Sequence, residues 1–265
     1  MSVAIGLAVV VERSTPMRGA VELVVHHPPA AAAVKPGQFF QLAVAAPQTI
    51  LRRPYSAAWA DPQSGRIGFI FNVVGAGSGW LAVRHEGHEL DLLGPLGRGF
   101  DLDRTGPAII VAGGLGVAVF PGVVRALVGR GRHVTVLLGA RTSAQLLPAD
   151  RFPGAEVMTA TDDGSAGYHG SVVDLLASAR GEGPEIFSCG PTSMLQALVE
   201  RTRRLEVPLR SIQVSLESPM GCGVGTCLGC AIPRPGSGYL LTCLDGPCLA
   251  ADRINWDRIT DTFHG

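Results

Sequence analysis

Residues 108–116 read AIIVAGGLG, an apolar run that ends in a glycine turn. An uninterrupted run of this kind is typical of a strand buried in a parallel sheet. Gly113, Gly114 and Gly116 form the turn, and helical spacing of apolar residues follows at 123–128. A doubly wound sheet binds dinucleotides at such a junction of strand, turn and helix. Because the turn is not a complete G-x-G-x-x-G, close packing of helix on strand is the structural alternative.

Downstream, apolar runs alternate with helical patterns. Buried strands are expected at 133–138, 156–160 and 185–188, and helices at 171–180 and 192–203. This alternation predicts an α/β domain with a doubly wound parallel sheet over residues 104–210.

Two loops at strand ends of this sheet are expected to face its ligand crevice. Asp162 follows the strand at 156–160, and Cys189 follows the strand at 185–188. Both are candidates for contact with a dinucleotide. For Asp162 the alternative is a solvated turn, and for Cys189 it is a buried, inert thiol.

Residues 1–103 have a different pattern. Short apolar or β-branched runs at 3–11, 20–26, 38–44 and 66–74 are separated by glycine and proline. Repeated short strands with this punctuation predict a small antiparallel β-barrel.

The barrel contains the segment Arg53-Pro54-Tyr55-Ser56. Arginine can bind a phosphate through two N–H groups, and tyrosine offers a flat face for stacking on an aromatic ring system. The Ser56 hydroxyl can bond a ring heteroatom. An Arg–Tyr pair on a strand edge is the structural alternative.

A second glycine turn follows the strand at 66–74. Gly77 and Ser78 lie in it, and small residues there let backbone N–H groups approach a pyrophosphate, to which Ser78 can add a hydroxyl donor. An ordinary turn from strand to helix is the alternative.

Residues 221–243, GCGVGTCLGCAIPRPGSGYLLTC, carry four of the six cysteines of the chain, Cys222, Cys227, Cys230 and Cys243. The first three have the C-x4-C-x2-C spacing of plant-type [2Fe–2S] sites, whereas zinc sites usually contain paired C-x2-C motifs. Glycines beside the thiols allow the backbone to approach an inorganic core. The segment predicts an electron-transfer centre in a small domain at 211–265. Zinc, buried thiols and disulfides are the alternatives, and Cys248 is a possible substitute ligand.

Composition limits the class of protein. The 22 basic and 22 acidic residues balance, which argues against a nucleic-acid partner. The longest apolar stretch, 107–120, is too short and too rich in glycine to cross a membrane. No secretory signal is evident, and thiols available for metal fit a reducing compartment, so a cytoplasmic location is expected.

Taken together, these motifs resemble the ferredoxin–NADP reductase superfamily. The tail, from Ser-Leu-Glu at 215–217 through the cysteine segment to Cys-x-Asp-Gly-Pro at 243–247, is similar to the electron-transfer subunit of two-component, NAD-dependent dihydroorotate dehydrogenases. The family often has Arg at the position of Asn72 and Thr at that of Ser78.

The resemblance implies a set of cofactor contacts. FAD would lie on the barrel, and a [2Fe–2S] cluster would be ligated by Cys222, Cys227, Cys230 and Cys243. The implied FAD contacts are Arg53, Pro54, Tyr55, Ser56, Ile70, Phe71, Asn72, Gly77 and Ser78. The implied NAD contacts are Gly113, Gly114, Gly116, Asp162 and Cys189.

The resemblance also implies an activity. Electrons would pass from dihydroorotate, through FMN on a separate catalytic subunit, to this [2Fe–2S] centre, then to FAD and NAD+, in pyrimidine biosynthesis. The partners would form a heterotetramer of two copies each. Because cofactors carry the chemistry, no side chain is expected to act as a general acid or base.

Two other functions fit the motifs. One is a reductase (diaphorase) subunit of a soluble hydrogenase or a related enzyme. The other is a zinc-stabilised binding module on a degenerate nucleotide fold. No basic residue other than Arg141 is suited to a 2′-phosphate near 139–141, which favours NAD over NADP.

Overall fold

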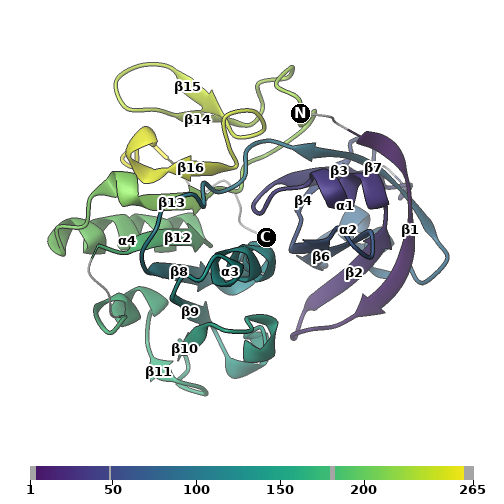
Figure 1. Ribbon diagram of the computed structural model, residues 1–265. Coiled ribbons are helices and arrows are strands. Elements are labelled where there is room, and N and C mark those ends of the chain that lie inside the picture. The colour runs from purple at the N-terminus through teal and green to yellow at the C-terminus, as the bar shows by residue number, and fades with distance from the viewer. Residues whose placement is uncertain (1–3, 48, 180–182, 260–265) are drawn as a thin grey trace.

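The computed structural model describes residues 4–47, 49–179 and 183–259. It contains two seven-stranded sheets side by side, with a small C-terminal hairpin above the second (Figure 1). In the part of the chain that is described, no helix has the length and apolar character needed to cross a membrane.

The first sheet is antiparallel throughout and has the order β4-β3-β7-β1-β2-β6-β5. It curls around an apolar core that includes Leu23, Phe40 and Phe69, which confirms the expected barrel. The elements are β1 (Ala4–Ser14), β2 (Ala20–His26), α1 (Pro28–Ala33), β3 (Phe39–Leu42), β4 (Arg53–Ser56), β5 (Trp59–Asp61), β6 (Arg66–Asn72), α2 (Ala76–Ala82) and β7 (Glu89–Leu96).

The second sheet has the order β11-β10-β9-β8-β12-β13-β16, parallel except for β16. Helix α3 packs against one face and α4 against the other, so the doubly wound fold is confirmed. The elements are β8 (Ala108–Gly113), α3 (Phe120–Gly129), β9 (Val134–Ala140), β10 (Glu156–Thr161), β11 (Tyr168–His169), β12 (Glu185–Cys189), α4 (Thr192–Arg204), β13 (Ile212–Ser215) and β16 (Cys248–Ala250).

Alternating side chains of β8 explain why two helices are needed. Ile110 points to the face covered by α3, and Ile109 and Val111 point to the face covered by α4. A strand buried on both faces has no polar side, which is why its sequence reads as a continuous apolar run.

The prediction of a helix at 171–180 needs correction. The structure has a 3-10 helix, Val172–Ala177, and Arg180 lies outside the described residues, as does Val3 of the first expected strand. The side chain of Val172 packs directly over Gly139 of β9. A Cβ added to Gly139 would lie only 2.6 Å from Val172 Cβ. The segment is thus held close to the sheet, and over these residues it forms the tighter 3-10 turns that are common in short connections.

The C-terminal segment returns to the second sheet. After the hairpin of β14 (Ala231–Pro233) and β15 (Tyr239–Leu241), strand β16 pairs antiparallel with β13. Strands on both sides of residue 211 therefore share one sheet. The domain limits at 103/104 and 210/211 stay predictions.

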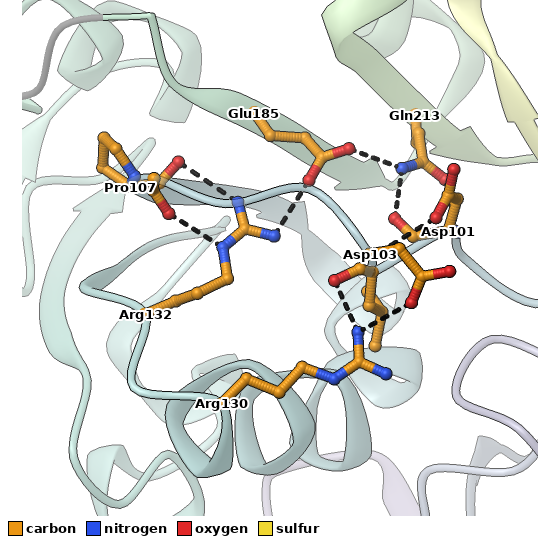
Figure 2. Close-up of polar contacts among 9 residues, drawn as sticks. Asp101, Asp103, Pro107, Arg130, Arg132, Glu185 and Gln213 are labelled. Atoms are coloured by element: carbon orange, nitrogen blue, oxygen red, sulfur yellow. Dashed lines mark hydrogen bonds and ion pairs between the residues drawn. The ribbon is translucent and has the colours of Figure 1, made fainter.

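A buried polar network ties the linker between the sheets to the base of the second sheet (Figure 2). Arg132 and Glu185 form an ion pair of 3.0 Å, and both side chains are 4% exposed. Gln213 donates to Glu185 at 2.8 Å and exchanges hydrogen bonds with the backbone of Asp101. Because every charge in it is paired, this network can be buried and can fix the linker.

Candidate cofactor sites

Arg53 of β4 lies against the first turn of α2. A Cβ added to Gly77 would come within 2.8 Å of Arg53 Nε, so the glycine allows the arginine side chain to lie close to this turn. Arg53 Nη1 donates to the carbonyl of Leu51 at 2.7 Å. The two motifs picked out by sequence thus meet in space, and a guanidinium beside backbone N–H groups suits a phosphate.

The Ser78 hydroxyl is used within the turn. It accepts hydrogen bonds from the N–H groups of Val74 and Gly75 at 2.9 and 3.1 Å, and lies 3.1 Å from the Gly75 carbonyl. Ser78 is buried, so its hydroxyl shapes the turn. Its contact with a pyrophosphate stays a prediction.

Tyr55 of β4 lies beside Phe71 of β6, a strand that is not paired with β4 but comes close to it because the sheet curls. The ring centroids are 5.0 Å apart and the planes are inclined by 45°. Burial raises the pKa of Tyr55 to about 12, against the opposing effect of the Arg53 charge. A phenol is neutral at physiological pH even at its ordinary pKa, and burial extends that neutral range, so Tyr55 can pack on an aromatic ligand without the cost of burying a charge.

The other expected FAD residues surround this pair. Pro54 and Ser56 are half-buried on β4, and Asn72 is half-buried at the end of β6. Phe71 belongs to the barrel core, whereas Ile70 packs in the core of the second sheet. The roles of all of these residues toward FAD stay predictions.

The glycine turn after β8 packs against the loop after β12. A Cβ on Gly116 would approach the Cys189 carbonyl oxygen to 2.4 Å and the Gly190 nitrogen to 2.6 Å. A Cβ on Gly113 would approach Met194 Sδ to 2.4 Å. Gly114 has φ +53° and open space around it. The sequence-predicted loops therefore meet at the carboxyl ends of two adjacent strands, the place where such sheets bind ligands.

Asp162 and Cys189 differ in their surroundings. Asp162 is exposed at the same edge of the sheet, but β9 separates its strand β10 from β8. Cys189 is buried, and burial raises the pKa of its thiol well above the usual range. Its thiol is therefore unreactive. Contact of either residue with NAD stays a prediction.

The four clustered cysteines form two pairs. The Sγ atoms of Cys230 and Cys243 are 3.2 Å apart and buried. The backbone N–H of Cys227 donates to Cys222 Sγ at 3.5 Å, and both of these thiols reach the surface. Within the described ranges, no three His, Cys, Asp or Glu side chains form a ready-made site for a metal ion. Two thiol pairs suit a cluster in which each of two irons takes two cysteines, whereas tetrahedral zinc needs four ligands around one point.

The loop around Cys222 is prepared for a negative charge. Its sulfur receives the N–H groups of Val224, Thr226 and Cys227 at 3.4, 3.3 and 3.5 Å. These donors, that of Cys227 foremost, lower the pKa of Cys222 to about 6. A thiolate held by backbone N–H groups is the form that ligates iron, so the donor set fits the cluster.

Sequence reasoning missed Gln41 on β3. It is fully buried, and within the described residues neither its Oε1 nor its Nε2 has a hydrogen-bond partner. The sequence feature that could have pointed to it is the polar glutamine within the otherwise apolar strand FFQL.

Comparisons with known proteins agree with this arrangement. The family model described as the iron-sulfur cluster binding domain of dihydroorotate dehydrogenase B matches residues 217–255. A solved structure described as NADH-dependent reduced ferredoxin-NADP oxidoreductase has a TM-score of 0.84 and 29% identity, and the match covers 95% of this chain and 91% of that one.

Two curated relatives are named dihydroorotate dehydrogenase B (NAD(+)), electron transfer subunit. The protein of Bacillus caldolyticus is 38% identical over 227 residues, which is 83% of this chain and 86% of the relative. The protein of Shouchella clausii (strain KSM-K16) is 36% identical over 257 residues, 94% of this chain and 97% of the relative. The chain therefore belongs to the family of dihydroorotate dehydrogenase B (NAD+) electron transfer subunits.

Proposed function

We propose that this protein carries electrons between a dihydroorotate dehydrogenase catalytic subunit and NAD+, using FAD and a [2Fe–2S] cluster. When bound, the flavin exchanges two electrons with a nicotinamide and the cluster exchanges one at a time. The protein supplies position and electrostatics, and none of its side chains is assigned as an acid or base.

The main support for this proposal is that Arg53, the arginine expected to bind phosphate, and the cysteine loop lie next to each other. Leu51 accepts a hydrogen bond from Arg53 through its carbonyl, and its side chain lies 3.8 Å from the position that a Cβ on Gly221 would take. The expected FAD site and the expected cluster site therefore adjoin, as electron transfer between them requires.

The residues have separate tasks in this proposal. Arg53 and the turn at Gly77 hold the FAD pyrophosphate, while Tyr55 packs near the flavin ring. Cys222, Cys227, Cys230 and Cys243 ligate the cluster. The NAD site is the turn of Gly113, Gly114 and Gly116 with Cys189 beside it and Asp162 at the same edge.

The catalytic subunit is proposed to dock over the cysteine loop. Exposed apolar side chains surround this loop: Leu51 is 53% exposed, Leu228 61% and Leu244 49%. Leu228 also has φ +60°, which projects an apolar side chain from the turn between Cys227 and Cys230. Apolar residues grouped around a redox centre fit a partner that must come within electron-transfer distance.

The complex is proposed to contain two copies of each subunit and to lie in the cytoplasm, in keeping with six free thiols.

The test is to purify the protein without oxygen, alone and with a dihydroorotate dehydrogenase catalytic subunit. The isolated protein is expected to show flavin and iron–sulfur absorption, to contain two irons per chain and to oxidise NADH with an artificial dye. Dihydroorotate-dependent NAD+ reduction is expected only in the complex. A colourless protein that contains zinc would overturn the proposal, and a coloured protein unable to couple to that subunit would favour another reductase.

A further inference from the structure

Gln41 is an amide with unused hydrogen-bonding capacity in the barrel wall. Its side chain is fully buried, and Oε1 and Nε2 are both without a partner among the described residues. Buried side-chain amides nearly always have partners, because burial removes the bonds to water that they make in the unfolded chain. The amide therefore points to a group that binds there.

The direction of the side chain follows from strand geometry. Neighbouring residues of a strand point to opposite faces, so Phe39 and Gln41 share one face while Phe40 and Leu42 share the other. Phe40 and Leu42 pack inside the barrel, whereas Phe39 packs against Cys230 and Cys243. Gln41 thus faces the cysteine segment.

Gly223 shows how near the amide comes to that segment. Gly223 is buried and follows Cys222 directly, and a Cβ on it would lie 2.8 Å from Gln41 Nε2 and 2.9 Å from Gln41 Cγ. Its φ of +74° also favours glycine. The loop that holds Cys222 therefore rests on the Gln41 amide, with no side chain between them.

We propose that Gln41 donates a hydrogen bond from Nε2 to a sulfur of the cluster held by this loop, and that this bond raises the reduction potential of the cluster. The inference rests on the proposed function. One-electron reduction adds a negative charge to the cluster, and an N–H donor stabilises the reduced form more than the oxidised form. Hydrogen bonds to the sulfurs are among the factors that set the potential of such clusters.

The direct test uses the holoprotein with ¹⁵N in its glutamine side-chain amides. After reduction with dithionite, pulsed EPR is expected to detect a ¹⁵N coupling to the cluster. The coupling should vanish in Gln41→Leu and persist in Phe39→Leu, which removes apolar volume beside the cysteines but no hydrogen-bonding group. A wild-type cluster without this coupling would overturn the inference, even if Gln41→Leu failed to fold.

A redox titration followed by EPR gives the second readout. Gln41→Leu is expected to lower the equilibrium constant for reduction of the cluster about tenfold, which is ~59 mV for a one-electron couple. Phe39→Leu should leave it close to the wild-type value. An unchanged potential in Gln41→Leu refutes the tuning role and leaves the proposed function intact, whereas a wild-type protein without any EPR-active cluster refutes both.

Discussion

The carboxylate of Glu22 in the barrel is neutralised by Arg151, which ends a short 3-10 helix between β9 and β10 of the second sheet. Arg151 Nη2 lies 2.5 Å from Glu22 Oε1, and the Glu22 side chain is only 3% exposed. The same oxygen accepts a hydrogen bond from Trp59 Nε1 at 2.8 Å. A charge buried in one domain is thus balanced from the other, so separating the two domains would leave it unpaired.

Arg151→Met is therefore expected to destabilise the fold. Removing one partner of a buried ion pair leaves the other charge uncompensated, and a loss of about 3 kcal/mol in the free energy of unfolding is expected. Chemical denaturation measures it. Arg204→Met is the control, because the Arg204–Glu200 pair is exposed and should contribute less than about 0.5 kcal/mol. Equal effects of the two variants would contradict the role of the Glu22 pair.

Cys227→Ser is expected to abolish cluster assembly while FAD stays bound, because the barrel site does not include this thiol. Iron content and flavin content per chain measure the two effects. Cys248→Ala is the matched control, since Cys248 is buried and its thiol lies 3.5 Å from the Gly37 carbonyl. Full iron content in Cys227→Ser, or its loss in Cys248→Ala, would show that the ligand set is misassigned.

Arg53→Ala is expected to weaken FAD binding by about 1.5–3 kcal/mol, the usual contribution of a hydrogen bond to a charged group. Flavin occupancy after dialysis, and the dissociation constant by titration, measure it. Arg66→Ala removes an exposed arginine from the start of β6 and should leave occupancy unchanged. Undiminished retention by Arg53→Ala would remove Arg53 from the FAD site.

Gly116→Ala is expected to force apart the two loops of the NAD site, because the added Cβ meets rigid backbone at Cys189 and Gly190. We expect the KM for NADH to rise about tenfold, which corresponds to ~1.4 kcal/mol, with iron and flavin contents unchanged. Dye reduction by NADH measures it. In Gly129→Ala, where the added Cβ has no atom within 4 Å, the KM should stay constant. A normal KM in Gly116→Ala would place NAD elsewhere.

The raised pKa of Tyr55 predicts a dependence on alkaline pH. From its ordinary pKa near 10 up to the folded value of about 12, the unfolded chain loses this proton while the folded protein keeps it. Stability is therefore lost as pH rises through this window, and the contribution is fully present below pH 10. Phenolate absorption is measured during an alkaline titration of the wild type and of Tyr55→Phe. The absorption that the variant lacks should appear near pH 12. A difference centred near pH 10 would mean that Tyr55 is not buried.

Much of the fold follows from local sequence pattern. The run at 20–26 is β2 and the run at 108–112 lies within β8, because buried strands are mainly apolar; the charged exception in β2, Glu22, is paired with Arg151. The return of β16 to the second sheet could not be read in this way, since three residues after a cysteine loop carry no periodicity. Such pairing depends on tertiary contacts.

In the candidate site too, some features follow from local sequence and others depend on tertiary contacts. Glycines and cysteines could be proposed as site residues from their spacing, because their chemistry and backbone freedom are rare properties; their roles stay predictions. The pairing of the four thiols and the position of Gln41 could not, since both depend on which strand lies beneath the loop. Even a polar residue in an apolar strand says nothing of its ligand until the neighbouring segment is placed.

The return of β16 to β13 has a mechanical consequence. The cysteine segment leaves the second sheet after β13 and rejoins it at β16, and Arg98 and Pro247 bridge it to the end of the barrel. It is thus an insertion anchored at both ends, not an arm that swings on a hinge. A redox partner must approach this fixed platform, and proteolysis or unfolding that frees either anchor should release the metal and loosen the edge of the sheet in a single event.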